Sequence, residues 1–204
     1  MWALIEDSEI VKIINNPKAM VIGDTRHSRN IFSSRWTNEE REAIGLYEIV
    51  IDNSNKRDEA YYTNTNQSFD FADGVATASF GSATAKELDD RNATDDDGVE
   101  LDPIVVIEGL KTQHKSIIKS QASGLLEPTD WYNHKALDDE TFTISVNIKT
   151  YRANIRSTSN TMETAIDNAA DVDALATLYE YVNTGTEENP VMERPLGEWP
   201  ELEV

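Results

Sequence analysis

The sequence of 204 residues predicts an α+β fold: a small, mainly β N-terminal module, then a helical module that ends in an extended tail. Three observations predict it. Residues 1–82 alternate apolar and polar side chains between tight-turn signals. Apolar residues at helical spacing begin only after residue 102. The last segment, 183–204, holds three prolines and two glycines and should be extended. We therefore expect a β module at 1–82, an acidic linker at 83–102 and a helical module with its tail at 103–204.

The β module should begin with a hairpin in "MWALIEDSEIVKII", whose two short strands meet at Glu6–Ser8. In "TNEEREAIG", Thr37 stands three residues before Glu40, which is a capping box for a short helix, and Gly45 suits a left-handed C-terminal cap. The stretch "LYEIVID" should be a strand. In "SFDFADGVATASF", Asp73-Gly74 between two alternating runs predicts a second hairpin.

The segment 83–102 is polar and acidic and is interpreted as a linker. At its end, Asp102-Pro103 resembles a cap followed by proline in the first turn, so a long helix is expected from there to about Ala122. A short helix should begin at Thr129-Asp130. A third helix is expected over 146–168, and Asp171 can cap a fourth. The third helix has these apolar or aromatic residues along one side: Ile148, Tyr151, Ile155, Met162 and Ile166.

Charge is distributed unevenly along the chain, whose net charge is −20. Residues 61–102 and 171–204 carry −8 each, whereas 1–60 carry −3 and 103–170 carry −1. Phosphate contacts need a basic surface, so we expect no nucleic-acid partner. The acidic first residues do not resemble a signal peptide and no apolar run is long enough to span a bilayer, so we expect neither classical export nor a membrane partner.

No motif of enzyme chemistry stands out. The pair Ser116 and Lys119 matches S-x-x-K, but the companion elements of serine acyl enzymes are missing. The histidines show no metal-ligand spacing, the acidic segment does not match a calcium loop, and no phosphate-binding glycine loop is present. We therefore expect no catalytic residues, no cofactor and no metal. Lys111, Lys115 and Lys119 form either a solvated flank or a basic groove for an acidic segment.

The chain contains three short motifs in this order: "DW" at Asp130 and Trp131, "YRxxIR" at Tyr151, Arg152, Ile155 and Arg156, and "WP" at Trp199 and Pro200. With these motifs the chain resembles a family of tailed-bacteriophage proteins, the tail-fibre assembly chaperone group. The resemblance spans most of the chain and is strongest from about Leu110 to the end. The stretch "DDETFTISVNIKT" departs from the family, whose members reach the "YRxxIR" helix through a turn containing proline.

The resemblance implies a non-enzymatic tail or tail-fibre protein that assists fibre assembly by binding the fibre. The alternative is a permanent structural component of the virion tail or its fibres. Its partner would be a tail or fibre protein, with a homo-oligomer or a symmetric attachment to a fibre as further expectations. Its location would be the host cytoplasm during assembly, or the virion tail in the alternative.

The "YRxxIR" and "WP" stretches also predict a docking surface. Tyr151, Arg152, Ile155 and Arg156 would present a helix face with two guanidinium groups that can hold carboxylates. Trp199 would be an apolar anchor stiffened by Pro200, with Glu198, Glu201 and Glu203 as acids. Either the tail folds back onto this face, or a partner occupies it.

Overall fold

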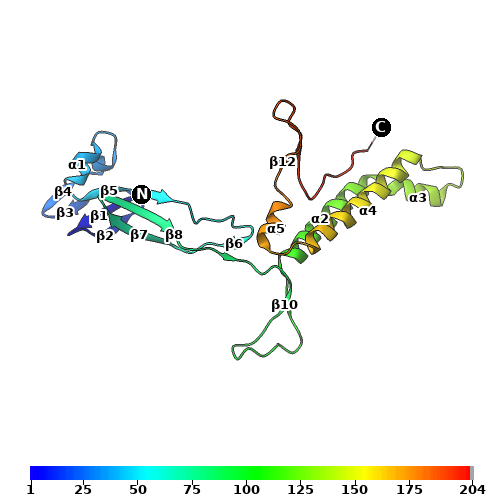
Figure 1. The fold of residues 1–204 in the computed structure, drawn as a ribbon, viewed down its shortest axis with the longest axis horizontal. Helices are drawn as coiled ribbons and strands as arrows, with labels where there is room; N and C mark the ends of the chain where they lie inside the picture. Colours follow the sequence, from blue (N-terminus) through cyan, green and yellow to red (C-terminus); the bar gives the residue numbers. More distant parts are fainter. Residues whose placement is uncertain (203–204) are drawn as a thin grey trace. The chain divides into compact units, whose positions relative to one another are not determined.

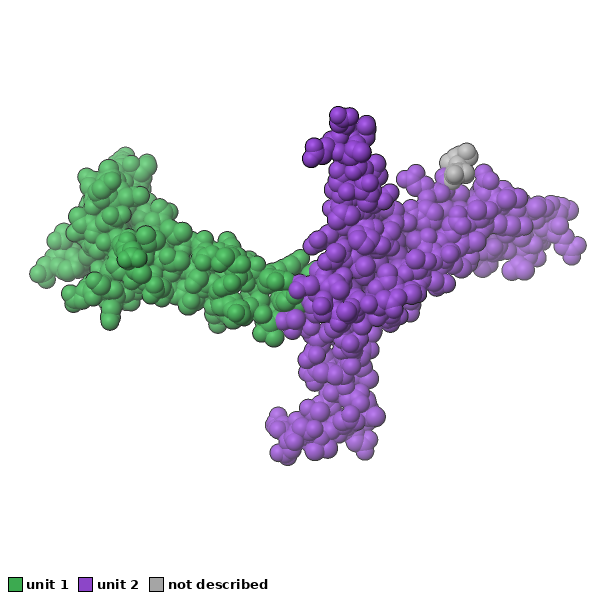
Figure 2. Space-filling view, in the orientation of Figure 1, with its two compact units in different colours: residues 1–84 green, residues 85–204 purple. Residues whose placement is uncertain are grey.

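The computed structural model describes residues 1–202 and confirms the α+β fold. The chain forms two compact units, residues 1–84 and residues from Ala85 onward (Figure 2). The first unit is mainly β and the second holds the long helices (Figure 1).

The first unit is built on a five-stranded mixed sheet in the order β2-β1-β5-β8-β7. Only the central β5–β8 pair is parallel. The edge strands β2 and β7 approach one another, so the sheet curls into a half-barrel. Its strands are β1 (Trp2–Glu6), β2 (Glu9–Ile14), β5 (Leu46–Asp52), β7 (Gln67–Ala72) and β8 (Val75–Phe80).

Both hairpins expected in this unit are confirmed. Their central residues have positive φ, 49° and 64° at Asp7-Ser8 and 51° and 79° at Asp73-Gly74, as tight two-residue turns require. Gly45 has a φ of 77°, and a Cβ there would lie 2.5 Å from the backbone oxygen of Ile5. The left-handed position predicted for Gly45 is therefore also a position where only glycine fits.

Each face of the sheet buries its own apolar cluster. Inside the curl lie Ala3, Ile5, Ile49, Ala76 and Ala78. The opposite face carries Leu4, Ile14, Ile31 and Leu46. Short elements contribute to that second cluster or lie beside it: β3 (Met20–Ile22), β4 (Thr25–His27), the 3₁₀ helix η1 (Arg29–Phe32) and α1 (Asn38–Glu42). The capping box of α1 is confirmed, with reciprocal bonds of 2.8 and 3.2 Å between Thr37 and Glu40.

The core of the second unit is a pair of packed helices, α2 (Leu110–Leu126) and α4 (Val146–Asp167), which lie side by side (Figure 1). The bounds of α4 match the predicted helix. Its buried residues are Ile148, Arg152, Ile155, Ser159, Met162 and Ile166. The predicted cap of the next helix is confirmed too, because the Asp171 carboxylate accepts from the Ala174 amide at 2.7 Å. The remaining elements are β6 (Tyr62–Thr63), β9 (Thr84–Ala85), β10 (Arg91–Asn92), β11 (Val106–Ile107), η2 (Glu127–Thr129), α3 (Asp130–Asp138), α5 (Val172–Thr177), β12 (Val182–Asn183) and β13 (Met192–Glu193).

The prediction that the long helix begins at Pro103 is wrong, since α2 begins at Leu110. The β-branched run Ile104–Ile107 instead enters strand β11, which pairs with β10.

The N-cap residue of α2 is Gly109, which has no side chain that could cap the helix. The side chain of Asp90, outside the helix, takes this role. Its carboxylate accepts from the Gly109 amide at 2.8 Å and from the Thr112 hydroxyl at 2.9 Å. Both hydrogen bonds lower the pKa of Asp90, and the one from the Gly109 amide has the larger effect.

The acidic segment interpreted as a linker is largely paired. From Arg91 to Ile107 the chain forms a hairpin that projects from the helices (Figure 1). At its tip the Asp95 carboxylate accepts from the amides of Asp97 and Val99 at 3.0 and 2.9 Å, and Gly98 has a φ of 80°. A second hairpin, β12–β13, projects elsewhere on the same unit. After α5 the described residues contain no further helix, in agreement with the predicted extended tail.

Candidate partner-docking surface

Arg152 ties α4 to the end of α2 and the start of α3. Its Nη1 donates to the backbone oxygen of Leu126 at 2.9 Å and to the hydroxyl of Thr129 at 2.5 Å. Its Nη2 donates to the carboxylate of Asp130 at 2.7 Å. The side chain is buried and every one of these partners comes from the α2–α3 junction. The Asp of "DW" and the Arg of "YR" are therefore joined in an ion pair.

This position differs from the expectation that Arg152 offers its guanidinium to tail carboxylates. Arg156, one turn later, is exposed, and its Nη1 donates to the backbone oxygen of Arg152 at 3.2 Å. Four residues advance a helix by one turn plus about 40°, which suffices to carry one arginine into the junction and leave the other in solvent. The two arginines do not form one docking surface.

The other residues of the predicted surface lie at different depths. Ile155 is completely buried and cannot meet a partner. Tyr151 is half-buried and its hydroxyl lies 3.4 Å from the backbone oxygen of Leu125. Pro200 and Glu201 line one groove with Tyr151. The tail therefore folds back along the helices, one of the two arrangements expected from the sequence.

Trp199 contacts α2, not the Ile155 face where we expected it. Its indole N–H donates to the side-chain oxygen of Gln121 at 3.1 Å, and it lines a groove with Gly124 and Leu125. Upstream, Leu196 is buried and its amide donates to the backbone oxygen of Leu178 at 2.9 Å. The tail is thus held at three successive points: Leu196, Trp199 and Pro200.

The tail acids pair locally. The Glu198 carboxylate accepts from the Tyr181 hydroxyl at 2.8 Å and lies 3.0 Å from Arg194. The hydrogen bond to Glu198 raises the pKa of Tyr181. Glu203 lies outside the described residues.

Replacing Trp199 with alanine is expected to cost about 2 kcal/mol of unfolding free energy, roughly half the cost at a fully buried aromatic site, because the ring is only half-buried. Trp199→Phe keeps most of the apolar contact and loses only the hydrogen bond, so about 1 kcal/mol is expected. Chemical denaturation followed by helical circular dichroism measures both. An alanine variant as stable as the wild type would mean that the tail is not held at Trp199.

The lysine row of α2 is paired with acids of the same chain. Lys111 lies 3.0 Å from Asp89, Lys115 2.6 Å from Asp167 and Lys119 3.4 Å from Glu163. Two of these acids belong to α4, so the row joins the two long helices. The tail does not occupy it as a basic groove.

His114, on the same helix, contacts Tyr179, with Nδ1 2.7 Å from the hydroxyl oxygen. Burial lowers the pKa of His114 below its ordinary value of 6.5. A lowered folded-state pKa means that the unfolded chain takes up the proton first. The contribution of His114 to stability is therefore complete above pH 6.5 and is lost as the pH falls through the folded-state pKa.

We expect the second unit to be less stable at pH 5 than at pH 7.5, with a smaller difference in His114→Gln, which cannot titrate there. The carboxylates titrate equally in both proteins. The difference between the two proteins in how the unfolding free energy changes with pH therefore isolates the contribution of His114. Denaturation midpoints across this range measure it. Identical slopes would show that His114 does not carry the effect.

An aromatic cluster at the far end of the helix pair was not identified from sequence periodicity. We call it the aromatic end: Trp131, Tyr132 and Phe142. The Trp131 and Tyr132 rings stack at 3.9 Å, and the Phe142 ring centroid lies 6.3 Å from that of Tyr132. The ammonium of Lys135 lies 4.4 Å above Phe142. Trp131 is 50% exposed, whereas tryptophan side chains usually bury a large apolar area. The "DW" motif was the available sequence signal, whereas Phe142 lies in the segment that departs from the family pattern.

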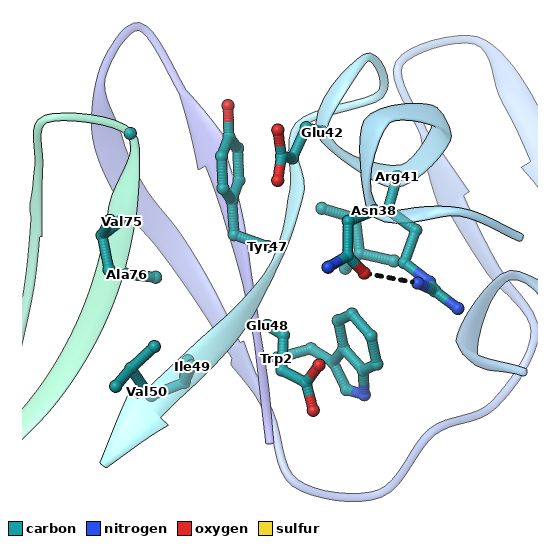
Figure 3. Close-up of a pocket in the computed structure, with 12 residues that line it drawn as sticks. Trp2, Asn38, Arg41, Glu42, Tyr47, Glu48, Ile49, Val50, Val75 and Ala76 are labelled. Carbon is teal, nitrogen blue, oxygen red and sulfur yellow. Dashed lines mark hydrogen bonds between the residues drawn. The ribbon is translucent and has the colours of Figure 1, made fainter. Parts of the chain in front are cut away.

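A groove in the first unit is lined by one cation, Arg41, and by the carboxylates of Glu42 and Glu48 (Figure 3). Its buried cation, Arg41, donates to the backbone oxygens of Ile31 and Ser33 and to the side chain of Asn38, the bond drawn in the figure. The guanidinium also lies 4.9 Å from the centre of the Trp2 ring. Arg41 therefore fastens α1 and η1 over the sheet.

Within residues 1–202, no group of three or more acidic, histidine or cysteine side chains is placed to hold a metal ion. None of the helices described there is both long and apolar enough to cross a membrane. Comparison with protein-family models, with curated proteins and with solved structures yields no match to this chain.

Proposed function

We propose that this chain is a non-enzymatic tail or tail-fibre protein of a tailed bacteriophage, which assists fibre assembly by binding the fibre at the aromatic end. The observation that carries the proposal is the Asp130–Arg152 pair, 2.7 Å apart. This ion pair gives a physical role to "DW" and "YR", two of the motifs whose order along the chain carries the resemblance. In this reading Asp130 and Arg152 are positioning residues, and Trp131 is the contact residue.

The properties of the aromatic end favour binding of another protein. Exposed aromatic side chains on a rigid helix are typical anchors of interfaces, because they bury much area for little conformational entropy. Here α3 is held at its first residue by the buried Arg152, so a partner would meet an ordered Trp131. The fibre segment that binds should present an apolar pocket for this indole.

A role as a permanent structural component of the tail or its fibres is the second candidate. The projecting hairpin of residues 91–107 favours it, because Ile104 and Val106 are 63% and 53% exposed there. Exposed apolar residues on a projecting hairpin suit a lasting interface. In the first proposal the protein acts in the host cytoplasm, and in the second it resides in the virion tail.

Quantitative mass spectrometry of infected-cell lysate and of purified virions would test both proposals. An assembly factor should be found with fibre protein in the lysate and be nearly absent from mature particles. A structural component should be present in particles at a fixed ratio to another tail protein. If the chain associates with no tail or fibre protein in either sample, both proposals are wrong.

A further inference from the structure

The hairpin of residues 91–107, which we call the acidic arm, combines strong negative charge with exposed apolar side chains. It holds five acidic residues and one basic residue, a net charge of −4. Val99, Ile104 and Val106 are 61%, 63% and 53% exposed. A two-stranded ribbon with so much apolar surface in water gains little from its own pairing and is suited to packing against another surface.

A surface of opposite charge lies in the first unit. Residues 10–36 hold five basic residues and one acidic residue, a net charge of +4 in a chain of −20. The five basic residues are exposed, and none makes an ion pair with any residue in the described part of the chain: Lys12, Lys18, Arg26, Arg29 and Arg35. They contrast with the α2 lysines, each of which has an acidic neighbour.

We call four exposed residues on and beside the β3–β4 hairpin the basic face: Lys12, Lys18, Val21 and Arg26. Val21 and Arg26 are opposite one another in the β3–β4 pair, so their side chains share one side of that hairpin. Val21 is 61% exposed. Lys12 and Lys18 line a groove together with Met20 at the base of the same hairpin.

We propose that the chain self-associates head to tail, with the acidic arm of one copy docked on the basic face of another. The charges are opposite, both surfaces expose β-branched residues, and two arms would repel one another. A contact between different surfaces of identical chains repeats, and it closes into a ring or continues as a filament. The proposal rests on the charge and exposure of these two surfaces and is independent of the aromatic end.

Two charge-reversal variants and a mixing experiment test it. The face variant carries Lys12→Glu, Lys18→Glu and Arg26→Glu. The arm variant carries Asp96→Lys, Asp97→Lys and Glu100→Lys, which leaves the turn-forming Asp95 intact. A control variant carries Glu180→Lys, Glu187→Lys and Glu188→Lys, three exposed acids outside the arm, and so changes the net charge by the same amount as the arm variant. Sedimentation velocity of the full chain gives the size of each species.

We expect the wild type and the control to form oligomers whose size grows with concentration at physiological salt. These should dissociate near 1 M salt, where the Debye length falls to about 3 Å. Each reversal variant alone should be monomeric. A mixture of the two should form oligomers again, because the intact arm of one meets the intact face of the other and the two reversed surfaces also carry opposite charges. This recovery also shows that both variants are folded.

Three results would overturn the proposal. One is a wild-type chain that stays monomeric at every concentration. Another is a face or arm variant that still forms wild-type oligomers on its own. The third is a mixture of the two variants that remains monomeric. The proposed binding of fibre protein uses the aromatic end and neither of these surfaces, so the outcome is separable from that of the proposed function.

Discussion

Arg152→Ala is expected to lower the unfolding free energy of the helical unit by about 2–4 kcal/mol, because it removes the hydrogen bonds of a buried guanidinium whose ionic partner, Asp130, is 51% exposed. The change removes the Nη1 donor from the Thr129 hydroxyl and from the Leu126 carbonyl, which keeps only its bond from the Thr129 hydroxyl at 2.8 Å, and it opens a cavity at the α2–α3 junction. Because small domains are stable by only about 5–15 kcal/mol, much of the stability of the unit would be lost. Denaturant unfolding followed by helical circular dichroism measures the effect, since nearly all helical residues belong to this unit.

Arg156→Ala is the matched control for that measurement. It removes the same side chain one turn away, where the guanidinium is exposed and bonds only within its own helix. A change within about 0.5 kcal/mol is expected there, as for most surface positions. Equal losses in the two variants would contradict the role given to Arg152 as a buried tie.

Trp131→Ala is expected to weaken binding of the fibre or tail partner by about 2 kcal/mol or more, roughly 30-fold in Kd, as for an interface anchor. The unfolding free energy should fall by only about 1 kcal/mol, because half of the side chain is already in solvent and the other half packs on Tyr132 and Phe142. Titration of purified partner against both proteins, by calorimetry or fluorescence anisotropy, measures the difference in Kd. The contrast with Arg152→Ala is that this variant stays folded while it loses affinity.

Leu137→Ala serves as the control for that experiment, since Leu137 lies on the same helix outside the aromatic end and is 81% exposed. Its Kd should equal that of the wild type. If Trp131→Ala and Leu137→Ala bind equally well, the aromatic end is not the anchor.

Features specified by neighbouring residues could be predicted from the sequence. Asp73-Gly74 specifies a tight turn because both residues accept positive φ. The capping box of Thr37 and Glu40 forms within a single turn of helix. The helix of residues 146–167 follows from a regular apolar stripe. Each of these signals depends on residues close together in the chain.

The start of α2 could not be predicted because two local signals compete. Asp102-Pro103 favours a helix start, whereas the β-branched run after it favours a strand, and pairing with Arg91 and Asn92 decides in favour of the strand. That partner strand is itself short and lies in a polar segment. No periodicity in the sequence marks it.

The arrangement of the candidate site also depends on distant residues. Arg152 is buried because the end of α2, 26 residues earlier, supplies a carbonyl that faces it. Spacing along one helix placed Arg152 and Arg156 on one face, but packing against the neighbouring helix separates them. The aromatic end likewise joins residues from α3 and from the loop after it, which share no common period.

The central claim is that Trp131 contacts a tail or fibre protein, and site-specific photo-crosslinking tests it most directly. Benzoylphenylalanine would replace Trp131 in one protein and the exposed Thr161, in the second half of α4, in a control. Both would be irradiated in infected cells, and the adducts identified by mass spectrometry. We expect an adduct with a tail or fibre protein from position 131 and none from position 161. No such adduct from position 131, or equal labelling of the same protein from both positions, would contradict the account.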